Sequence, residues 1–241
     1  MRYLTAAALS AAAASSVFAQ SVQTAGHTDI RFLYNSSTGD ASIDYHLGAG
    51  SVVDGVSLAA DTAYATTDLI TYIPDPAVAR PGGAAWDFTG NSAGDPLWYI
   101  PFSQEVDRPW TGISTESVSS ADFSNISYEL TAFFGPGEMS VVTFGPFGDP
   151  TIYFQTSNGL SSADVISVPA GTHAHFAWFF TEMGTYTFDL TVTGALTPGA
   201  GGGTVSATDT FTFQVVPAPA SIALLGLSGV ATLRRRRTAV L

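Results

Sequence analysis

The feature that most constrains this chain is a strand-like alternation of apolar and polar residues in short segments between Gly- and Pro-rich turns. It is clearest after Gly184, where Tyr186, Phe188, Leu190 and Val192 alternate with Thr and Asp residues. Successive side chains of a strand point to opposite faces, so this alternation predicts half-buried strands. No helical period of useful length occurs between residues 20 and 215. We therefore expect an all-β fold, an antiparallel immunoglobulin-like β-sandwich.

Two hairpins are expected within this sandwich. The first pairs residues 26–34 with 41–47 across an Asn/Ser/Gly/Asp turn, and the second pairs 173–180 with 185–192 across Met183-Gly184. The other predicted strands are 69–73, 86–88, 97–101, 126–134, 139–144, 151–155 and 210–216.

The first 19 residues differ from the body in composition. Arg2 gives a positive start, Leu4–Ala14 is small and apolar, and Val17-Phe18-Ala19 places small residues at the −3 and −1 positions of a cleavage site. This pattern predicts a secretory signal peptide over 1–19, and therefore an exported protein.

The C-terminal segment 216–241 combines three features. Pro217-Ala218-Pro219 comes first, an apolar run Ala220–Leu233 of 14 residues follows, and Arg234–Arg237 ends the pattern. The run is shorter than the ~20 residues of a spanning helix, and the arginines favour the cytoplasmic side. This arrangement resembles the PEP-CTERM sorting signal, with Pro-Ala-Pro in place of Pro-Glu-Pro. The resemblance implies an exosortase-type enzyme as partner and inner-membrane contact through 220–233. A plain C-terminal membrane anchor is the alternative.

The remaining body, residues 20–215, is strongly acidic. It contains three basic residues, Arg31, Arg80 and Arg108, against 20 acidic ones, so its formal charge is 3 − 20 = −17. Such a charge excludes nucleic acid as a partner and favours cations. The absence of Cys excludes disulfides and thiolate metal sites.

Histidines form the strongest chemical signal. His173 and His175 are two residues apart and share one strand face, while His27 and Asp29 do so in the first strand. His46 joins that face if the first hairpin has an even loop. Imidazole is the usual neutral ligand of divalent transition metals, and three His with one Asp suit zinc. We predict a mononuclear site, formed where the first hairpin lies beside the His173/His175 strand.

Calcium and sugars are two other candidate ligands. Acids in turns are candidates for calcium, although none forms a calcium-loop motif: Asp75, Asp87, Asp95, Asp107, Asp149 and Asp164. Aromatic residues in turns are candidates for a sugar-stacking platform: Trp86, Trp98, Tyr99, Trp110, Phe147 and Tyr153. Enzyme motifs such as Gly-x-Ser-x-Gly or a dinucleotide fingerprint are absent, and no catalytic residue is predicted.

Three blocks of the body are similar to the choice-of-anchor M domain of surface-anchored proteins. They are Gly26–Asp29, the segments from Pro96 through Leu160 that carry Gly135-Pro136-Gly137 and Phe147–Pro150, and Gly171–Tyr186 with its His-Ala-His. The resemblance implies a secreted domain with an anchoring tail, and a link in some relatives to zinc- or manganese-type importers.

The sequence thus predicts an exported, envelope-anchored, non-catalytic surface protein. The first hypothesis is that it binds zinc or another divalent transition metal through His27, Asp29, His46, His173 and His175. The alternative is a structural or adhesive module that binds glycan, calcium or another protein, with extracellular polysaccharide as a candidate partner and the histidines in packing roles.

Overall fold

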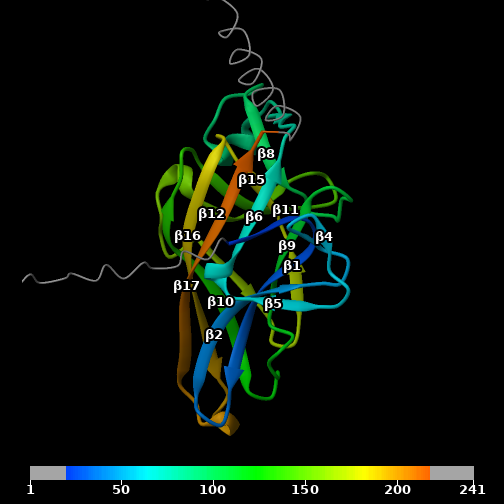
Figure 1. The fold of residues 1–241 in the computed structure, drawn as a ribbon. Helices are drawn as coiled ribbons and strands as arrows, with labels where there is room; N and C mark the ends of the chain where they lie inside the picture. Colours follow the sequence, from blue (N-terminus) through cyan, green and yellow to red (C-terminus); the bar gives the residue numbers. More distant parts are fainter. Residues whose placement is uncertain (1–19, 218–241) are drawn as a thin grey trace, which may run out of the picture.

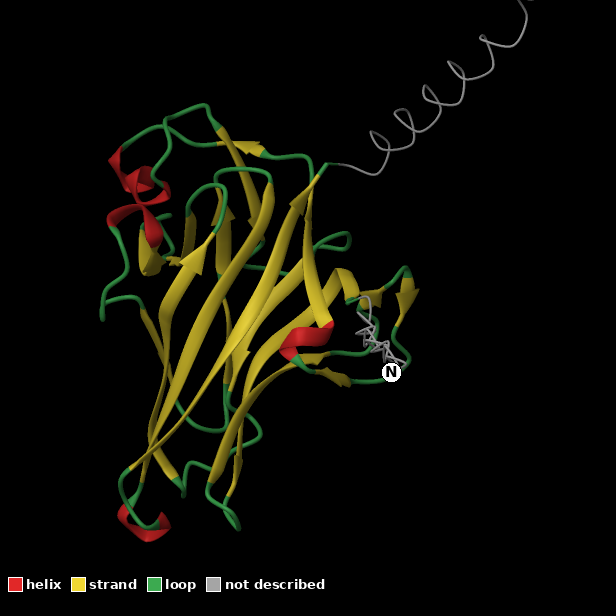
Figure 2. Ribbon diagram, turned by 60° about the vertical axis from the view of Figure 1, so that its left-hand side comes forward, coloured by secondary structure: helices red, strands yellow, loops and turns green. Residues whose placement is uncertain are grey.

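The computed structural model describes residues 20–217, which form two β-sheets packed as a sandwich (Figures 1 and 2). The predicted signal peptide 1–19 and residues 218–241 of the predicted sorting segment lie outside the described residues. No helix within 20–217 has the length and apolar character needed to cross a membrane.

The strands of the larger sheet are β1 (Ser21–Asn35), β2 (Asp40–Leu47), β3 (Val52–Val53), β4 (Val56–Ser57), β5 (Thr62–Tyr64), β6 (Leu69–Pro74), β9 (Pro109–Ser114), β10 (Phe123–Phe134), β13 (Val165–Val168), β14 (His173–His175), β16 (Gly184–Leu196) and β17 (Thr204–Val216). The smaller sheet contains β7 (Val78–Ala79), β8 (Pro96–Ile100), β11 (Met139–Phe144), β12 (Pro150–Gln155) and β15 (Ala177–Phe180). Short 3₁₀ turns are η1 (Thr66–Asp68), η2 (Ala84–Thr89), η3 (Thr156–Asn158) and η4 (Pro198–Ala200).

The order of strands is β13-β10-β16-β17-β6-β1-β2-β5 along the larger sheet and β12-β11-β15-β8-β7 along the smaller one. Most pairs are antiparallel, but β1–β6, β1–β9 and β6–β17 are parallel. The larger sheet is therefore mixed, whereas the smaller sheet is wholly antiparallel, as expected. Parallel neighbours need long connections, so distant segments of the chain meet at β1.

The core lies between the two sheets. Its largest fully buried side chains are aromatic and come from both layers, including Phe32, Tyr45, Trp178, Phe188 and Phe213. Phe32, Tyr45, Phe188 and Phe213 occupy buried positions of strands whose burial alternates, whereas all four residues of β15, including Trp178, are buried. Burial of such apolar area, at about 25 cal/mol per Å², is the main stabilising contribution to the fold.

Strand β1 bends at Gly26 and takes part in two stretches of the larger sheet. Residues before the bend pair with β6, and residues after it pair with β2 and β9. Gly26 has φ 94°, which favours glycine, and a Cβ there would lie 2.5 Å from Ser51 Cα. The bend turns the second half of β1, with His27 and Asp29, toward β9.

The first predicted hairpin is confirmed. β1 and β2 pair antiparallel across a four-residue turn after Asn35, and Asp29 lies directly opposite His46. The even loop therefore places His27, Asp29 and His46 on one face, as predicted for that case.

The second predicted hairpin is wrong. β15 pairs with β8 and β11 in the smaller sheet, whereas β16 pairs with β10 and β17 in the larger one. Residues 181–183 thus cross from the smaller sheet to the larger one. The buried side chains of β15 before this connection and of β16 after it pack in the same core. The segment 86–88 is also not a strand but lies within η2, and strands β9 and β13 were not predicted.

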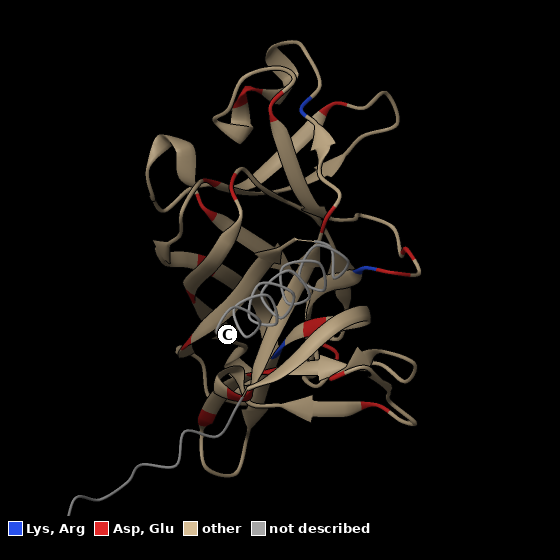
Figure 3. Cartoon of the chain, turned by 45° about the horizontal axis from the view of Figure 1, so that its top comes forward, with Lys and Arg blue, Asp and Glu red and all other residues tan. Residues whose placement is uncertain are grey.

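Acidic residues are distributed over the described fold, and basic residues are sparse (Figure 3). The three described arginines are engaged: Arg31 pairs with Asp44 at 2.6 Å, Arg80 with Asp87 at 2.7 Å, and Arg108 donates to the Pro76 carbonyl at 2.9 Å. The −17 charge of this part of the chain therefore has little local compensation.

Candidate metal centre

Four neighbouring strands, β2-β1-β9-β14, place the histidines on one surface. In this order, His46 faces Asp29, Asp29 faces Gly112, and Gly112 faces His175. The prediction that the first hairpin lies directly beside the His173/His175 strand is wrong, because β9 separates them. The two sets nevertheless converge, since the residue of β9 between them is glycine.

His27, His173 and His175 each offer a ring nitrogen, and the three atoms lie within 4.8 Å of one another. Nε2 of His27 is 3.1 Å from Nε2 of His175. Two donors bound tetrahedrally to zinc at 2.0–2.1 Å are about 3.3 Å apart, so this pair has the spacing that an ion requires.

Asp29 supplies a carboxylate beside this pair. Its Oδ2 is 3.5 Å from His27 Nε2, and its Oδ1 is 3.8 Å from His175 Nε2. The side chain is fully buried, yet neither oxygen has a hydrogen-bond partner among the described residues. A buried carboxylate without a donor is costly unless a cation compensates it.

The space for this group comes from Gly112. A Cβ at this position would lie 2.6 Å from Asp29 Oδ1, 2.8 Å from the Ala174 carbonyl and 2.9 Å from His175 Cε1. Any larger residue would therefore displace either the carboxylate or the imidazole. Glycine is required here for room, since its φ is not in the positive region.

Trp110 fixes the orientation of His175. The indole and imidazole rings stack with centroids 3.6 Å apart and planes 9° apart, and Trp110 Nε1 donates to the Phe102 carbonyl at 3.0 Å. The imidazole of His27 lies against the same indole at 5.3 Å. Trp110 was a candidate for a sugar-stacking platform in the sequence, and the structure places it in the histidine cluster.

His173 lies at the outer edge of the cluster. Its Nδ1 is 3.0 Å from Glu116 Oε1, which leaves Nε2 free to act as the metal donor. Glu116 was not predicted from the sequence. It lies two residues beyond the end of β9, and only the pairing of β9 with β14 brings it to His173.

The electrostatics favour neutral imidazoles in this site. Burial, together with the neighbouring histidines, lowers the pKa of His175 to about 3, and burial also lowers the pKa of His27. Burial raises the pKa of Asp29 to about 7. At neutral pH the two imidazoles are therefore uncharged, which is the state that binds a metal.

His46 lies on the same face but outside the group of converging nitrogens. The structure therefore brings three of the five predicted ligands, His27, His173 and His175, within mutual reach and places Asp29 beside two of them.

The candidate calcium acids do not converge within residues 20–217. Asp75 accepts from Trp98 Nε1, Asp87 pairs with Arg80, and buried Asp164 accepts from the backbone of Gln155. These carboxylates hold turns in place. Trp98 is also buried, which excludes it from a surface platform for sugars.

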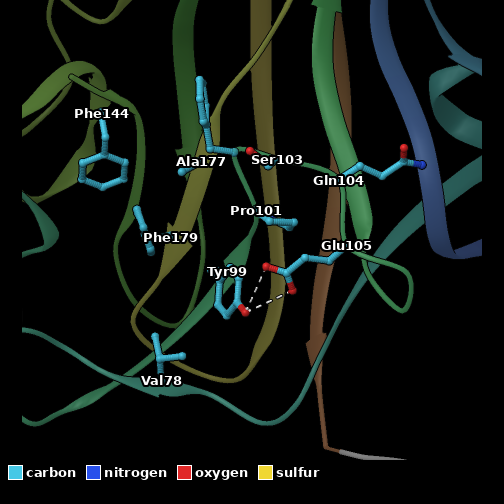
Figure 4. A pocket seen from close by; sticks show the side chains of 10 residues that line it. Val78, Tyr99, Pro101, Ser103, Gln104, Glu105, Phe144, Ala177 and Phe179 are labelled. Atoms are coloured by element: carbon cyan, nitrogen blue, oxygen red, sulfur yellow. Dashed lines mark hydrogen bonds between the residues drawn. The ribbon is translucent and has the colours of Figure 1, made fainter. Parts of the chain in front are cut away.

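A concave place apart from the histidine cluster lies on the outer face of the smaller sheet (Figure 4). This aromatic hollow has a volume of about 300 Å³ and is lined by Val78, Tyr99, Pro101, Phe102, Ser103, Gln104, Glu105, Phe144, Ala177 and Phe179. η2 covers the neighbouring part of the same face with Phe88 and Trp86. The Tyr99 hydroxyl donates to Glu105 at 3.2 Å, and the Arg108 guanidinium lies 4.2 Å from the Tyr99 ring centroid.

Comparisons with family models, with curated proteins and with solved structures gave no match to this chain.

Proposed function

We propose that this protein binds one divalent transition-metal ion, with zinc as the best fit, through His27, His173, His175 and Asp29. The observation that carries the proposal is Asp29, a fully buried carboxylate with no hydrogen-bond donor, 3.5 and 3.8 Å from two imidazole nitrogens. An ion between these groups would supply the charge that the carboxylate lacks.

The donor set selects the class of metal. Three imidazole nitrogens and one carboxylate oxygen, without sulfur, suit zinc in tetrahedral geometry and also bind copper(II) strongly. Calcium and magnesium prefer shells of oxygen ligands, so this cluster is a poor site for them. Four protein ligands would leave no open position, and we therefore propose a binding role without catalysis.

The cellular setting is a separate part of the proposal. We infer export through the 1–19 segment and envelope attachment through the 216–241 segment from their sequence patterns, with an immunoglobulin-like sandwich as the exported body. Zinc in this setting would meet an acidic surface that attracts cations.

Elemental mass spectrometry of purified residues 20–217, before and after chelation, tests the metal proposal. We expect about one equivalent of zinc or copper, and none in a variant carrying both His173→Ala and His175→Ala. The matched control is His46→Ala, which removes an imidazole of the same face outside the cluster. Absence of bound metal in the unaltered protein, with no thermal stabilisation by added zinc, would overturn the proposal and favour a surface-adhesion role.

A further inference from the structure

The candidate centre has a buried half and an exposed half. The side chain of Asp29 is 0% exposed and that of His175 is 7% exposed, whereas His173 is 40% and Glu116 is 53% exposed. A structural zinc site is usually enclosed by its ligands. Here one ligand and its carboxylate partner face solvent.

The buried half is held by packing. Trp110 stacks on His175, and β2 and β9 pair with β1 on the two sides of Asp29. His173 has no comparable cover, since it lies in the first position of the three-residue strand β14. Its contact with Glu116 is therefore the main restraint on its imidazole.

The backbones that carry His173 and Glu116 are joined by Thr115. This fully buried residue donates from its amide to the Thr172 carbonyl at 2.8 Å and from its hydroxyl to the Pro169 carbonyl at 2.6 Å. The Gly171 amide donates to the Thr115 carbonyl at 3.0 Å. Residues on either side of this junction, Glu116 and His173, thus face each other across a rigid connection.

Ser114 restrains Glu116 from the other side. The Glu116 amide donates to Ser114 Oγ at 3.2 Å, and that hydroxyl lies 3.5 Å from Glu116 Oε2. Because Ser114 and Thr115, the two residues before Glu116, are buried and hydrogen-bonded, the Glu116 carboxylate is held close to His173 despite being exposed.

We propose that Glu116 is the positioning residue of this centre and that the metal ion enters and leaves between Glu116 and His173. This inference rests on the proposed metal binding and adds the route and the control of exchange. Glu116 accepts the Nδ1–H of His173, which fixes the tautomer that presents Nε2 to the ion. Its charge also places a carboxylate at the mouth of the site, where an incoming cation meets it first.

The two roles of Glu116 are separable by substitution. Glu116→Gln keeps an oxygen that can accept from His173 Nδ1 but removes the charge, whereas Glu116→Ala removes both. Outer partners of metal-bound histidines contribute about 10- to 100-fold to affinity. Glu116→Ala should therefore weaken zinc binding by about 10- to 100-fold and accelerate zinc release, while Glu116→Gln should restore most of the affinity but slow zinc capture.

The experiment loads residues 20–217 with zinc and follows transfer to and from a chromophoric chelator by stopped flow, together with equilibrium competition. The control is Glu182→Ala, which removes one exposed carboxylate on the β15–β16 connection and should leave affinity and rates unchanged. Thermal unfolding of the zinc-free variants establishes that each is folded. Because Glu116 is half exposed, we expect no loss of stability.

The outcomes separate this inference from the proposed function. If the unaltered protein binds zinc but Glu116→Ala and Glu182→Ala have equal affinities and rates, the role of Glu116 is overturned and metal binding stands. If Glu116→Gln is as defective in affinity as Glu116→Ala, the hydrogen bond to His173 is not the cause and the positioning role is overturned. If the unaltered protein binds no zinc, the proposed function itself fails.

Discussion

The histidine cluster and the aromatic hollow of Figure 4 differ in how their polar groups are paired. In the hollow, the Tyr99 hydroxyl and the Glu105 carboxylate are bonded to each other, and the remaining lining is largely apolar. In the cluster, Asp29 and His175 contribute three of the five buried side-chain atoms within 20–217 that lack a hydrogen-bond partner.

This difference indicates what each place can do. Where the polar groups of a hollow are hydrogen-bonded, the hollow lowers the stability of the fold only through the apolar area that stays in contact with water. A buried carboxylate beside neutral imidazoles costs free energy in the metal-free state, and a cation would remove that cost. Unpaired buried groups, rather than the volume of a cavity, therefore mark the site that calls for a ligand.

The largest expected effect is that of filling the space between the two halves of the cluster. Gly112→Ala places a Cβ 2.6 Å from Asp29 Oδ1 and 2.8 Å from the Ala174 carbonyl, which as backbone cannot move aside. We expect zinc affinity to fall by about 100-fold or more. Overpacking should also lower the free energy of unfolding by about 1–3 kcal/mol. Zinc competition titration and urea unfolding measure the two effects.

The control for this substitution is Gly145→Ala. A Cβ at Gly145 meets only the Asp149 carbonyl at 3.7 Å, and the backbone φ is not in the positive region. Zinc binding by Gly112→Ala at the level of Gly145→Ala would show that the cluster is not the metal site.

The next expected effect is a pH dependence of the free energy of unfolding in the metal-free protein. The Asp29 carboxyl and the buried imidazoles contribute to it with opposite signs. The folded-state pKa of Asp29 is about 7, above the usual aspartate value of 3.8, so the unfolded chain releases this proton first as pH rises. Asp29 therefore lowers stability progressively from about pH 4 to about pH 7. The folded-state pKa of His175 is about 3, below 6.5, so this group raises stability between those two values.

Removing one kind of group should reveal the other. Asp29→Asn should give a free energy of unfolding that increases from about pH 3 to 6.5. A variant carrying both His27→Phe and His175→Phe, which removes the two imidazoles with lowered pKa, should give one that decreases from about pH 4 to 7. Each titrating group should contribute at most about 1.4 kcal/mol per pH unit to these slopes. Urea unfolding at several pH values, with chelator present, measures both. Slopes of the same sign in the two variants would contradict the assigned shifts.

The smallest effect is expected in the aromatic hollow. Phe102→Ser changes a side chain that is already 43% exposed, and it retains the backbone carbonyl that accepts from Trp110 Nε1. The free energy of unfolding should change by less than about 1 kcal/mol. Zinc affinity should be unchanged in competition titration. A loss of zinc binding would show that the hollow and the cluster are coupled through the connection before β9.

Much of the fold was predictable because strand periodicity is local. β11 was predicted with its observed bounds, and the first hairpin was predicted, with His46 on the face of His27 and Asp29 only if its loop were even. The partner of each strand was harder to predict. A three-residue connection at 181–183 has the same appearance whether it closes a hairpin or crosses between two sheets, and the crossing is decided by core packing on both sides.

By itself, the sequence determined which donors share a face, since side chains two residues apart in a strand point the same way. It thereby identified His27 with Asp29 and His173 with His175. The tertiary structure decided that β9 lies between these pairs, that Gly112 leaves the room in which they meet, and that Glu116 and Trp110 hold the two imidazoles. These relations depend on pairing between segments some 60 to 85 residues apart. The entropy lost in bringing such segments together is offset by burial of the whole core, which no local sequence pattern reports.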